Sequence, residues 1–168
     1  MPKNLESDRL IYRFFTENDH AFMKELLKDK KVCEYLPGPE IYPNEVIKRV
    51  LDYYVKSSNS DDKYQNIYLI IEKDSNYPIG YAGIQLVKEF NKYEIFYGFS
   101  VAAWGKGYGT ECSIRMRDLA VELGLKELIA LADIYNFASQ KILEKTGFTN
   151  KMKMPLWGLE LYYYEIKL

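Results

Sequence analysis

The chain has 168 residues, an apolar fraction of 48% and a formal net charge of −1, which suits one compact domain with its own core. Charged residues make up 28% with both signs mixed, which argues against nucleic acid as a main partner and against a disordered acidic chain. Two cysteines outside any CxxC pattern, no secretory signal core and no apolar run of about 20 residues favour the cytoplasm. We therefore expect a single domain over residues 1–168, without DNA or membrane as partner.

The first part of the chain predicts a strand followed by two helices. Apolar residues with interleaved arginines predict a strand over Leu5–Phe15. Cap-type residues at Thr16–Asp19 precede an apolar repeat at helical spacing that reaches Leu27. A second repeat of this kind predicts a helix over Pro43–Lys56, and the polar segment Ser57–Gln65 predicts a loop.

Three strands joined by short turns are expected next, over Ile67–Glu72, Pro78–Val87 and Glu94–Val101. In the third strand, alternation places successive side chains on opposite faces of the sheet. One face then carries Ile95, Tyr97, Phe99 and Val101, and the other carries Glu94, Phe96, Gly98 and Ser100.

The last part predicts alternating helices and strands. Apolar residues at helical spacing predict a helix that starts at Thr110 and ends at Gly124. A short apolar strand follows over Glu127–Asp133. A helix is expected over Asn136–Thr146, and the remaining residues to Leu168 predict a pair of strands. Consecutive strands with short turns are antiparallel, whereas a strand–helix–strand crossover is parallel. The expected fold is α+β, with a mixed sheet and helices on both faces.

Chemistry is expected at the turn Trp104-Gly105-Lys106-Gly107-Tyr108-Gly109, between a strand and an amphipathic helix. Glycines let a backbone approach a ligand closely, and the free N–H groups at a helix start attract anions such as a pyrophosphate. The lysine lies between glycines, so the turn is not a Walker A loop, and Gly-x-Gly-x-Gly is not a dinucleotide fingerprint. A tight turn without a ligand is the alternative at this point.

This turn resembles the hallmark Gln/Arg-x-x-Gly-x-Gly/Ala of the GNAT superfamily of N-acetyltransferases, with Trp104 in place of Gln/Arg. A tryptophan at this position followed by Gly-Lys-Gly-Tyr resembles the sequences of the branch that includes the ribosomal-protein acetyltransferases RimJ and RimL. Two further blocks match in order: Val32–Pro37, and Asn136–Ser139 followed by Ile142–Phe148. The resemblance implies a GNAT-like, mostly antiparallel central sheet flanked by about four helices. It also implies an acyltransferase that uses acetyl-CoA as co-substrate, without a metal, and with a homodimer as a possible assembly.

The resemblance implies which residues hold the cofactor. The amides of Gly105–Thr110 would hold the pyrophosphate, strand-edge groups of Phe99 and Val101 would face the pantetheine arm, and Lys106 or Lys141 would neutralise phosphate charge. Both lysines could instead be solvated surface cations. The implied set is Phe99, Val101, Trp104, Gly105, Lys106, Gly107, Tyr108, Gly109, Thr110, Asn136 and Ser139.

The same resemblance implies the catalytic groups Glu94 and Ser139. Many superfamily members carry a strand glutamate as base in the position of Glu94, although a strand-end glutamate could merely face solvent. The tyrosine that usually protonates the thiolate is replaced here by Leu143, so Ser139 becomes the candidate acid. Catalysis by positioning and carbonyl polarisation with little acid help is the alternative.

Tyr35, Leu36 and Tyr81 are candidates for the substrate pocket, or else core residues. The expected acceptor is a primary amine: a protein N-terminus, a small amine such as a polyamine or amino acid, or an aminoglycoside. Because His20 is the single histidine, the sequence lacks the residues expected for a metal site or a histidine-based triad. The alternatives to an enzyme of this kind are a non-catalytic acyl-CoA-binding domain and a different nucleotide-phosphate binder.

Overall fold

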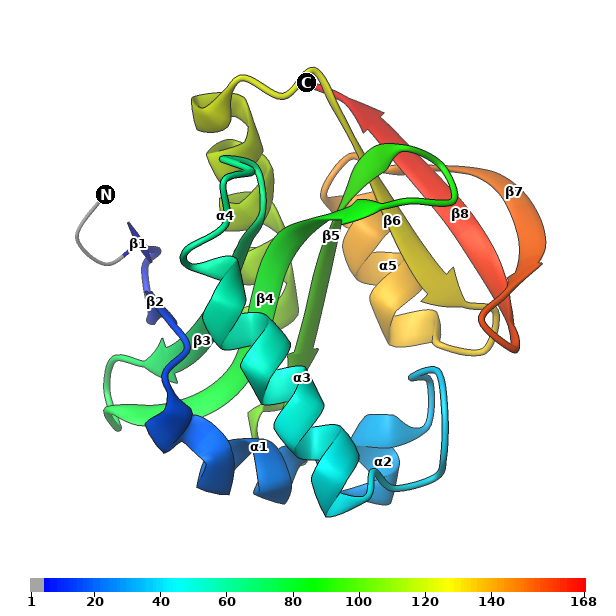
Figure 1. Ribbon diagram of the computed structural model, residues 1–168. Coiled ribbons are helices and arrows are strands. Elements are labelled where there is room, and N and C mark those ends of the chain that lie inside the picture. The colour runs from blue at the N-terminus through cyan, green and yellow to red at the C-terminus, as the bar shows by residue number, and fades with distance from the viewer. Residues whose placement is uncertain (1–4) are drawn as a thin grey trace.

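The computed structural model describes residues 5–168 as an eight-stranded sheet with helices on both faces (Figure 1). The strands are β1 (Leu5–Glu6), β2 (Leu10–Phe14), β3 (Asn66–Glu72), β4 (Tyr77–Val87), β5 (Lys92–Phe99), β6 (Glu127–Asp133), β7 (Thr149–Leu156) and β8 (Leu159–Lys167). Their order across the sheet is β1-β2-β3-β4-β5-β6-β8-β7.

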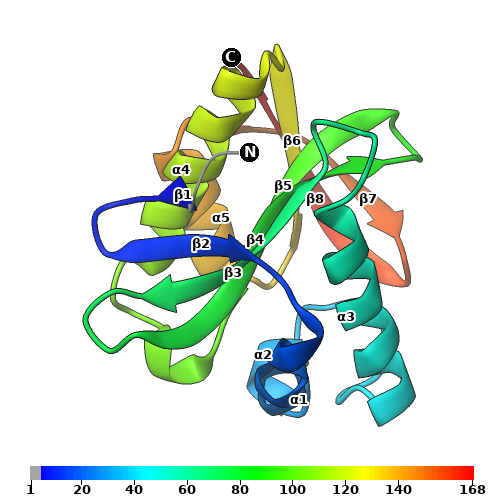
Figure 2. The ribbon, with the colours of Figure 1, turned by 60° about the vertical axis from the view of Figure 1, so that its left-hand side comes forward.

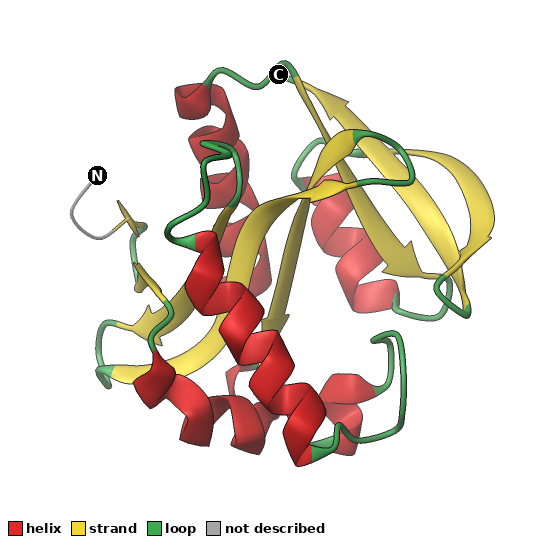
Figure 3. Ribbon diagram, viewed as in Figure 1, coloured by secondary structure: helices red, strands yellow, loops and turns green. Residues whose placement is uncertain are grey.

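Five α-helices and two short 3₁₀ helices cover the sheet (Figure 3). They are η1 (Glu17–Asp19), α1 (His20–Leu27), α2 (Lys30–Cys33), α3 (Asn44–Ser57), η2 (Val101–Ala103), α4 (Tyr108–Leu123) and α5 (Phe137–Lys145). Helices α1 to α3 pack on one face and α4 and α5 on the other (Figure 2). None of these helices is long and apolar enough to cross a membrane, as far as residues 5–168 are concerned.

The predicted topology is confirmed. Strands β3, β4 and β5 are antiparallel neighbours, as expected for short turns. The crossover through α4 makes β5 and β6 parallel, and β7 and β8 form an antiparallel pair. The α+β class with a mixed, mostly antiparallel sheet is therefore correct.

Two of the predicted strands have wrong bounds, and one helix was not predicted. The strand expected over Leu5–Phe15 is interrupted, because the Ser7 N–H donates to the Leu10 carbonyl over 3.0 Å and folds β1 back onto β2. The strand expected to reach Val101 ends at Phe99, since the next residues turn into η2. Helix α2 was not predicted, because its four residues are too few to show a helical repeat; the side chain of Asp29 caps it.

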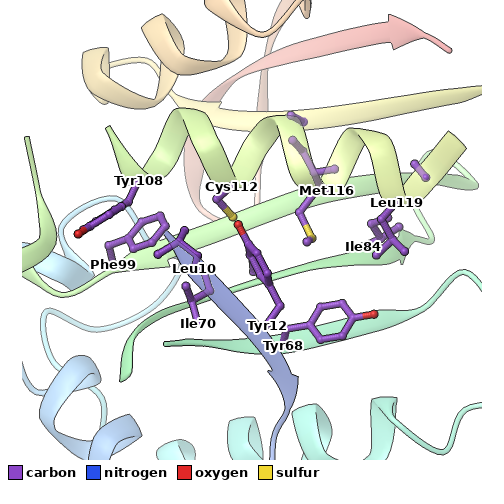
Figure 4. Packing of buried hydrophobic residues seen from close by; sticks show 14 of the residues in the cluster. Leu10, Tyr12, Tyr68, Ile70, Ile84, Phe99, Tyr108, Cys112, Met116 and Leu119 are labelled. Atoms are coloured by element: carbon purple, nitrogen blue, oxygen red, sulfur yellow. The ribbon is translucent and has the colours of Figure 1, made fainter. Parts of the chain in front are cut away.

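The core under α4 supports the turn that precedes this helix. Cys112 and Met116 of α4 are fully buried and point at the sheet, where Tyr12 and Ile84 are fully buried as well (Figure 4). Dense packing of this kind resists small displacements. The start of α4 at Tyr108 is therefore held firmly relative to β4 and β5.

Candidate active site

The sheet opens between β5 and β6. The two strands pair only at Glu94 and Ile129 and diverge toward the bottom of Figure 1. On its other side β5 remains bonded to β4, where the Ser100 N–H donates to the Ile79 carbonyl over 2.9 Å. Because backbone groups alternate in an antiparallel ladder, the N–H and C=O of Tyr97 and Phe99 point to the open side. The splay thus exposes a backbone edge to which an extended ligand can bind.

A cleft of about 920 Å³ occupies this opening and extends to the loop after α2. Most of the residues that the sequence singled out lie on its walls. They are Tyr35, Leu36, Tyr81, Glu94, Phe99, Trp104, Gly105, Gly107, Tyr108, Gly109, Thr110, Asn136 and Ser139.

The glycine turn forms the end of the cleft at α4. Gly105 and Gly107 have φ values of 73° and 82°, in the left-handed region that side chains other than glycine rarely adopt. Gly109 is needed for a different reason, since a Cβ there would lie 2.6 Å from Cδ1 of Ile142 in α5. The turn delivers the N-terminus of the 16-residue helix α4 to the cleft, which favours an anionic ligand.

Arg9, the residue before β2, contacts the glycine turn on the side away from the cleft. Its Nη1 donates to the Lys106 carbonyl and its Nε to Glu111, each over 2.8 Å, and the guanidinium lies 4.4 Å from the ring centre of Tyr108. The Tyr108 hydroxyl donates to Glu72. The Tyr108 side chain is therefore held by Glu72 and Arg9. Its backbone N–H belongs to the first turn of α4, where N–H groups have no partner within the helix.

The start of α5 brings two hydroxyl groups together. The Asn136 side-chain oxygen accepts the Ser139 N–H over 3.2 Å and caps the helix. The hydroxyl oxygens of Ser139 in α5 and Tyr97 in β5 lie 3.3 Å apart. Burial raises the pKa of Tyr97, so that its hydroxyl stays neutral. Leu143, one turn further along α5, is buried in the core.

Glu94 is a buried carboxylate on the wall of the cleft that faces α3. Its side chain is 5% exposed, and Gln85 Nε2 donates to its Oε1 over 2.8 Å. The Tyr53 hydroxyl donates in turn to Gln85 Oε1 over 3.0 Å, which fixes the orientation of the amide. Burial raises the pKa of Glu94 to about 7, although the Gln85 hydrogen bond lowers it. A carboxylate with such a pKa can accept and release a proton near neutral pH.

The acetyltransferase (GNAT) domain model matches residues 9–149. The chain belongs to the GNAT family of acetyltransferases. It is an acyltransferase by family, as the resemblance of the glycine turn and of the two further sequence blocks implied. No curated protein sequence matches it.

Several solved structures share this GNAT fold over nearly the whole chain. A GNAT-family acetyltransferase from Bacillus anthracis is 21% identical, with a TM-score of 0.83 and 98% of both chains covered. RimL, a ribosomal alpha-N-protein acetyltransferase in complex with coenzyme A, is 18% identical with a TM-score of 0.81, over 99% of this chain and 98% of that one. Spermidine N-acetyltransferase from Vibrio cholerae, in complex with coenzyme A and spermine, is 13% identical with a TM-score of 0.76 and 96% of both chains covered.

Three residues that the resemblance implied for the GNAT cofactor site lie outside the cleft walls, namely Val101, Lys106 and Lys141. Val101 belongs to η2, where its carbonyl accepts the Trp104 N–H, and is not a strand-edge residue. The Lys106 side chain is exposed, and its carbonyl is taken by Arg9. Phe99 keeps its place on the open edge, with its carbonyl accepting the Trp104 indole N–H over 3.0 Å.

The sequence reasoning missed three residues of this GNAT site: Arg9, Gln85 and Tyr97. Two of them contact a partner that is distant in the sequence: Arg9 and Glu111 are 102 residues apart, and Tyr97 and Ser139 are 42 residues apart. Gln85 could have been found, because the strands at Pro78–Val87 and Glu94–Val101 were both predicted and their register places Gln85 opposite Glu94. Within residues 5–168 no group of three or more His, Cys, Asp or Glu side chains is placed to hold a metal ion.

Proposed function

We propose that this GNAT domain is an acetyl-CoA-dependent N-acetyltransferase of the RimJ/RimL-like branch. It would transfer the acetyl group directly to the primary amine of a protein N-terminus or of a small molecule, in a ternary complex. The observation that carries the proposal is a buried carboxylate, Glu94, with a pKa near neutrality, in a cleft that ends at the N-terminus of α4.

The walls of the cleft suit the co-substrate along its length. The N–H groups at Gly105–Thr110 would bind the pyrophosphate, helped by the dipole of α4. The open edge of β5 at Phe99 would pair with the amides of the pantetheine arm. The Asn136 side-chain nitrogen remains for a further hydrogen bond, since its oxygen caps α5.

Glu94 would then act as the general base. An alkyl ammonium such as that of lysine titrates near pH 10.4 and an α-amine near 7.7–8.0, so the nucleophile must lose a proton before it can attack. Glu94 would accept that proton, and the neutral nitrogen would attack the thioester carbon. As the C–S bond breaks, the nitrogen of the adduct would lose its second proton and the sulfur would gain one, relayed by the Ser139 hydroxyl with Tyr97 behind it, which leaves an amide and a thiol.

A differential thermal-shift measurement tests the proposal first. We expect acetyl-CoA and coenzyme A to raise the melting temperature, by an amount that grows with ligand concentration, and ATP and NAD to leave it unchanged. Thiol release with a panel of primary amines should follow. Stabilisation without release with any amine would favour a non-catalytic acyl-CoA-binding domain, and stabilisation by ATP alone would contradict both functions.

The hydroxyl pair gives a second prediction. Ser139→Ala removes the group nearest the leaving sulfur, and we expect kcat to fall about tenfold or more while the Kd for coenzyme A stays within about threefold. Tyr97→Phe should lower kcat by less, because it leaves the Ser139 hydroxyl in place. Steady-state kinetics and calorimetric titration of coenzyme A measure the two quantities. A loss confined to cofactor binding would mean that Ser139 is a binding residue without a part in proton transfer.

A further inference from the structure

Glu111, in the first turn of α4, places a negative charge beside the glycine turn. Its side chain is only 14% exposed, and its N–H donates to the Gly107 carbonyl over 3.2 Å. Glu111 Oε1 accepts hydrogen bonds from the Ser7 hydroxyl and from the Arg9 backbone N–H, each over 2.7 Å. Burial raises the pKa of Glu111, but these hydrogen bonds and the Arg9 side chain outweigh this effect and hold the pKa below its usual value. Glu111 is therefore ionised at neutral pH.

A second carboxylate lies near the same turn. Glu72, at the end of β3, accepts a hydrogen bond from the Tyr108 hydroxyl. Hydrogen bonds from Ser75 and Tyr108 lower the pKa of Glu72, and the positive charges of Lys106 and Arg9 lower it as well, so Glu72 is also ionised at neutral pH. Because like charges repel, two carboxylates at the start of α4 would oppose the binding of a diphosphate there.

Arg9 is the cation that contacts both Glu111 and the glycine turn. Its Nε donates to Glu111 Oε2 and its Nη1 to the Lys106 carbonyl, each over 2.8 Å. A Cβ on Gly107 would lie 3.4 Å from its Nη2, so the guanidinium lies against the backbone from which α4 begins. The side chain of Lys106, by contrast, is exposed. Arg9 therefore supplies a positive charge that is held in place at this turn.

A cation bonded to a carboxylate cancels most of the repulsion that the carboxylate exerts on a nearby anion. We propose that Arg9 is a positioning residue of the coenzyme A site, which neutralises Glu111 and so allows the N–H groups of Gly105–Thr110 to bind the diphosphate. Arg9 lies outside the cleft walls, so it acts through Glu111 and the Lys106 carbonyl without touching the ligand. This inference rests on the proposed function, and it gives the segment between β1 and β2 a part in cofactor binding.

Calorimetric titration of coenzyme A into variants of Arg9 and Glu111 tests the inference. We expect Arg9→Gln to raise the Kd about tenfold, because the Glu111 carboxylate then keeps its charge without a counter-ion. Arg9→Lys, which preserves the positive charge, should keep the Kd within about threefold of wild type. The double variant Arg9→Gln with Glu111→Gln removes both charges together, so its Kd should also return to within about threefold of wild type. Damage to the fold cannot produce such a recovery.

A control residue and a second ligand show where Arg9 acts. Arg115→Gln is the matched control, because Arg115 also joins α4 to the first strands, by donating to the Glu6 carbonyl over 3.0 Å, and pairs with Glu122 away from the turn. Its Kd for coenzyme A should stay within about twofold of wild type. 3′-Dephospho-coenzyme A keeps the diphosphate and lacks the 3′-phosphate, so Arg9→Gln should weaken its binding by the same factor as that of coenzyme A.

Three results would overturn the inference while coenzyme A still binds to the wild type. The first is an unchanged Kd in Arg9→Gln, and the second is a loss for coenzyme A that 3′-dephospho-coenzyme A does not share, which would place Arg9 at the 3′-phosphate. The third is a tenfold loss in Arg9→Lys or in the double variant, which would make shape the cause in place of charge; this result decides the matter even if Arg9→Gln does not fold. A wild type that binds no coenzyme A would instead contradict the proposed function itself.

Discussion

Replacement of Glu94 by Gln is expected to lower kcat/KM for acetyl transfer by about 100-fold or more, because the amide has the shape of the carboxylate but cannot accept the proton. The fall should be largest for alkylamine acceptors, whose ammonium group holds its proton most tightly. Glu160→Gln is the matched control, since Glu160 is exposed on β8. If Glu94→Gln keeps wild-type activity, Glu94 is not the base. The proton would then be taken by water, or the acceptor would bind as the neutral amine already present in solution.

The pH dependence of the same pair gives a sharper readout. Burial raises the pKa of Glu94 to about 7. Wild-type kcat/KM for an alkylamine, which is almost all ammonium at these pH values, should therefore fall about tenfold per pH unit below that value and level off above it. The Glu94→Gln variant depends on the neutral amine alone, so its kcat/KM should keep rising with pH above about 7. A variant that keeps the break near pH 7 would show that another group titrates there.

The raised pKa of Glu94 also predicts an effect on stability. The folded state holds the proton of Glu94 more tightly than the unfolded state, so ionisation of this group destabilises the fold as pH rises from 4.5 to about 7. Glu94→Gln should therefore gain roughly 3 kcal/mol relative to wild type between pH 4 and pH 8. Urea unfolding at the two pH values measures the difference, and an equal effect at both would contradict the pKa.

Gly107→Ala is expected to raise the Kd for coenzyme A about tenfold or more. Gly107 has a φ of 82°, and an alanine there either strains the backbone by about 1–2 kcal/mol or rotates the N–H groups of the turn away from the ligand. Its Cβ would also lie 3.4 Å from Nη2 of Arg9, which holds the turn. Calorimetric titration measures the Kd.

Gly124→Ala is the control for backbone strain. Gly124 ends α4 with a φ of 91°, and a Cβ there meets nothing within 4 Å. Both variants should lose similar thermal stability, but only Gly107→Ala should lose affinity for coenzyme A. If the two variants bind coenzyme A equally well, the turn is a structural feature without a ligand.

Features of the fold that depend on neighbouring residues could be predicted from the sequence, whereas features that depend on residues distant in the sequence could not. The crossover through α4 and the face of β5 that carries Glu94 follow from local periodicity, which is why both could be predicted. The turn between β1 and β2 was missed although Ser7 and Asp8 are residue types that favour turns, because the apolar residues on both sides were assigned to one strand. The end of β5 was misplaced because it depends on where η2 packs.

The candidate site divides in the same way. The glycine turn and Asn136 are marked by residue type and spacing, so the sequence identifies them. The Tyr97–Ser139 pair and the Arg9 contacts exist only once β2, β5 and α5 are placed relative to one another, and residue type alone does not reveal them. The burial that raises the pKa of Glu94 likewise depends on how the folded chain packs around it, which residue type alone does not reveal.

A crystal structure of the complex with acetyl-CoA tests the central claim most directly. We expect the pyrophosphate on the main-chain N–H groups of Gly105–Thr110, the pantetheine arm along the open edge of β5, and the thioester between Glu94 and Ser139. A cofactor bound outside the opening between β5 and β6, or a cleft that stays empty at saturating acetyl-CoA, would contradict the claim.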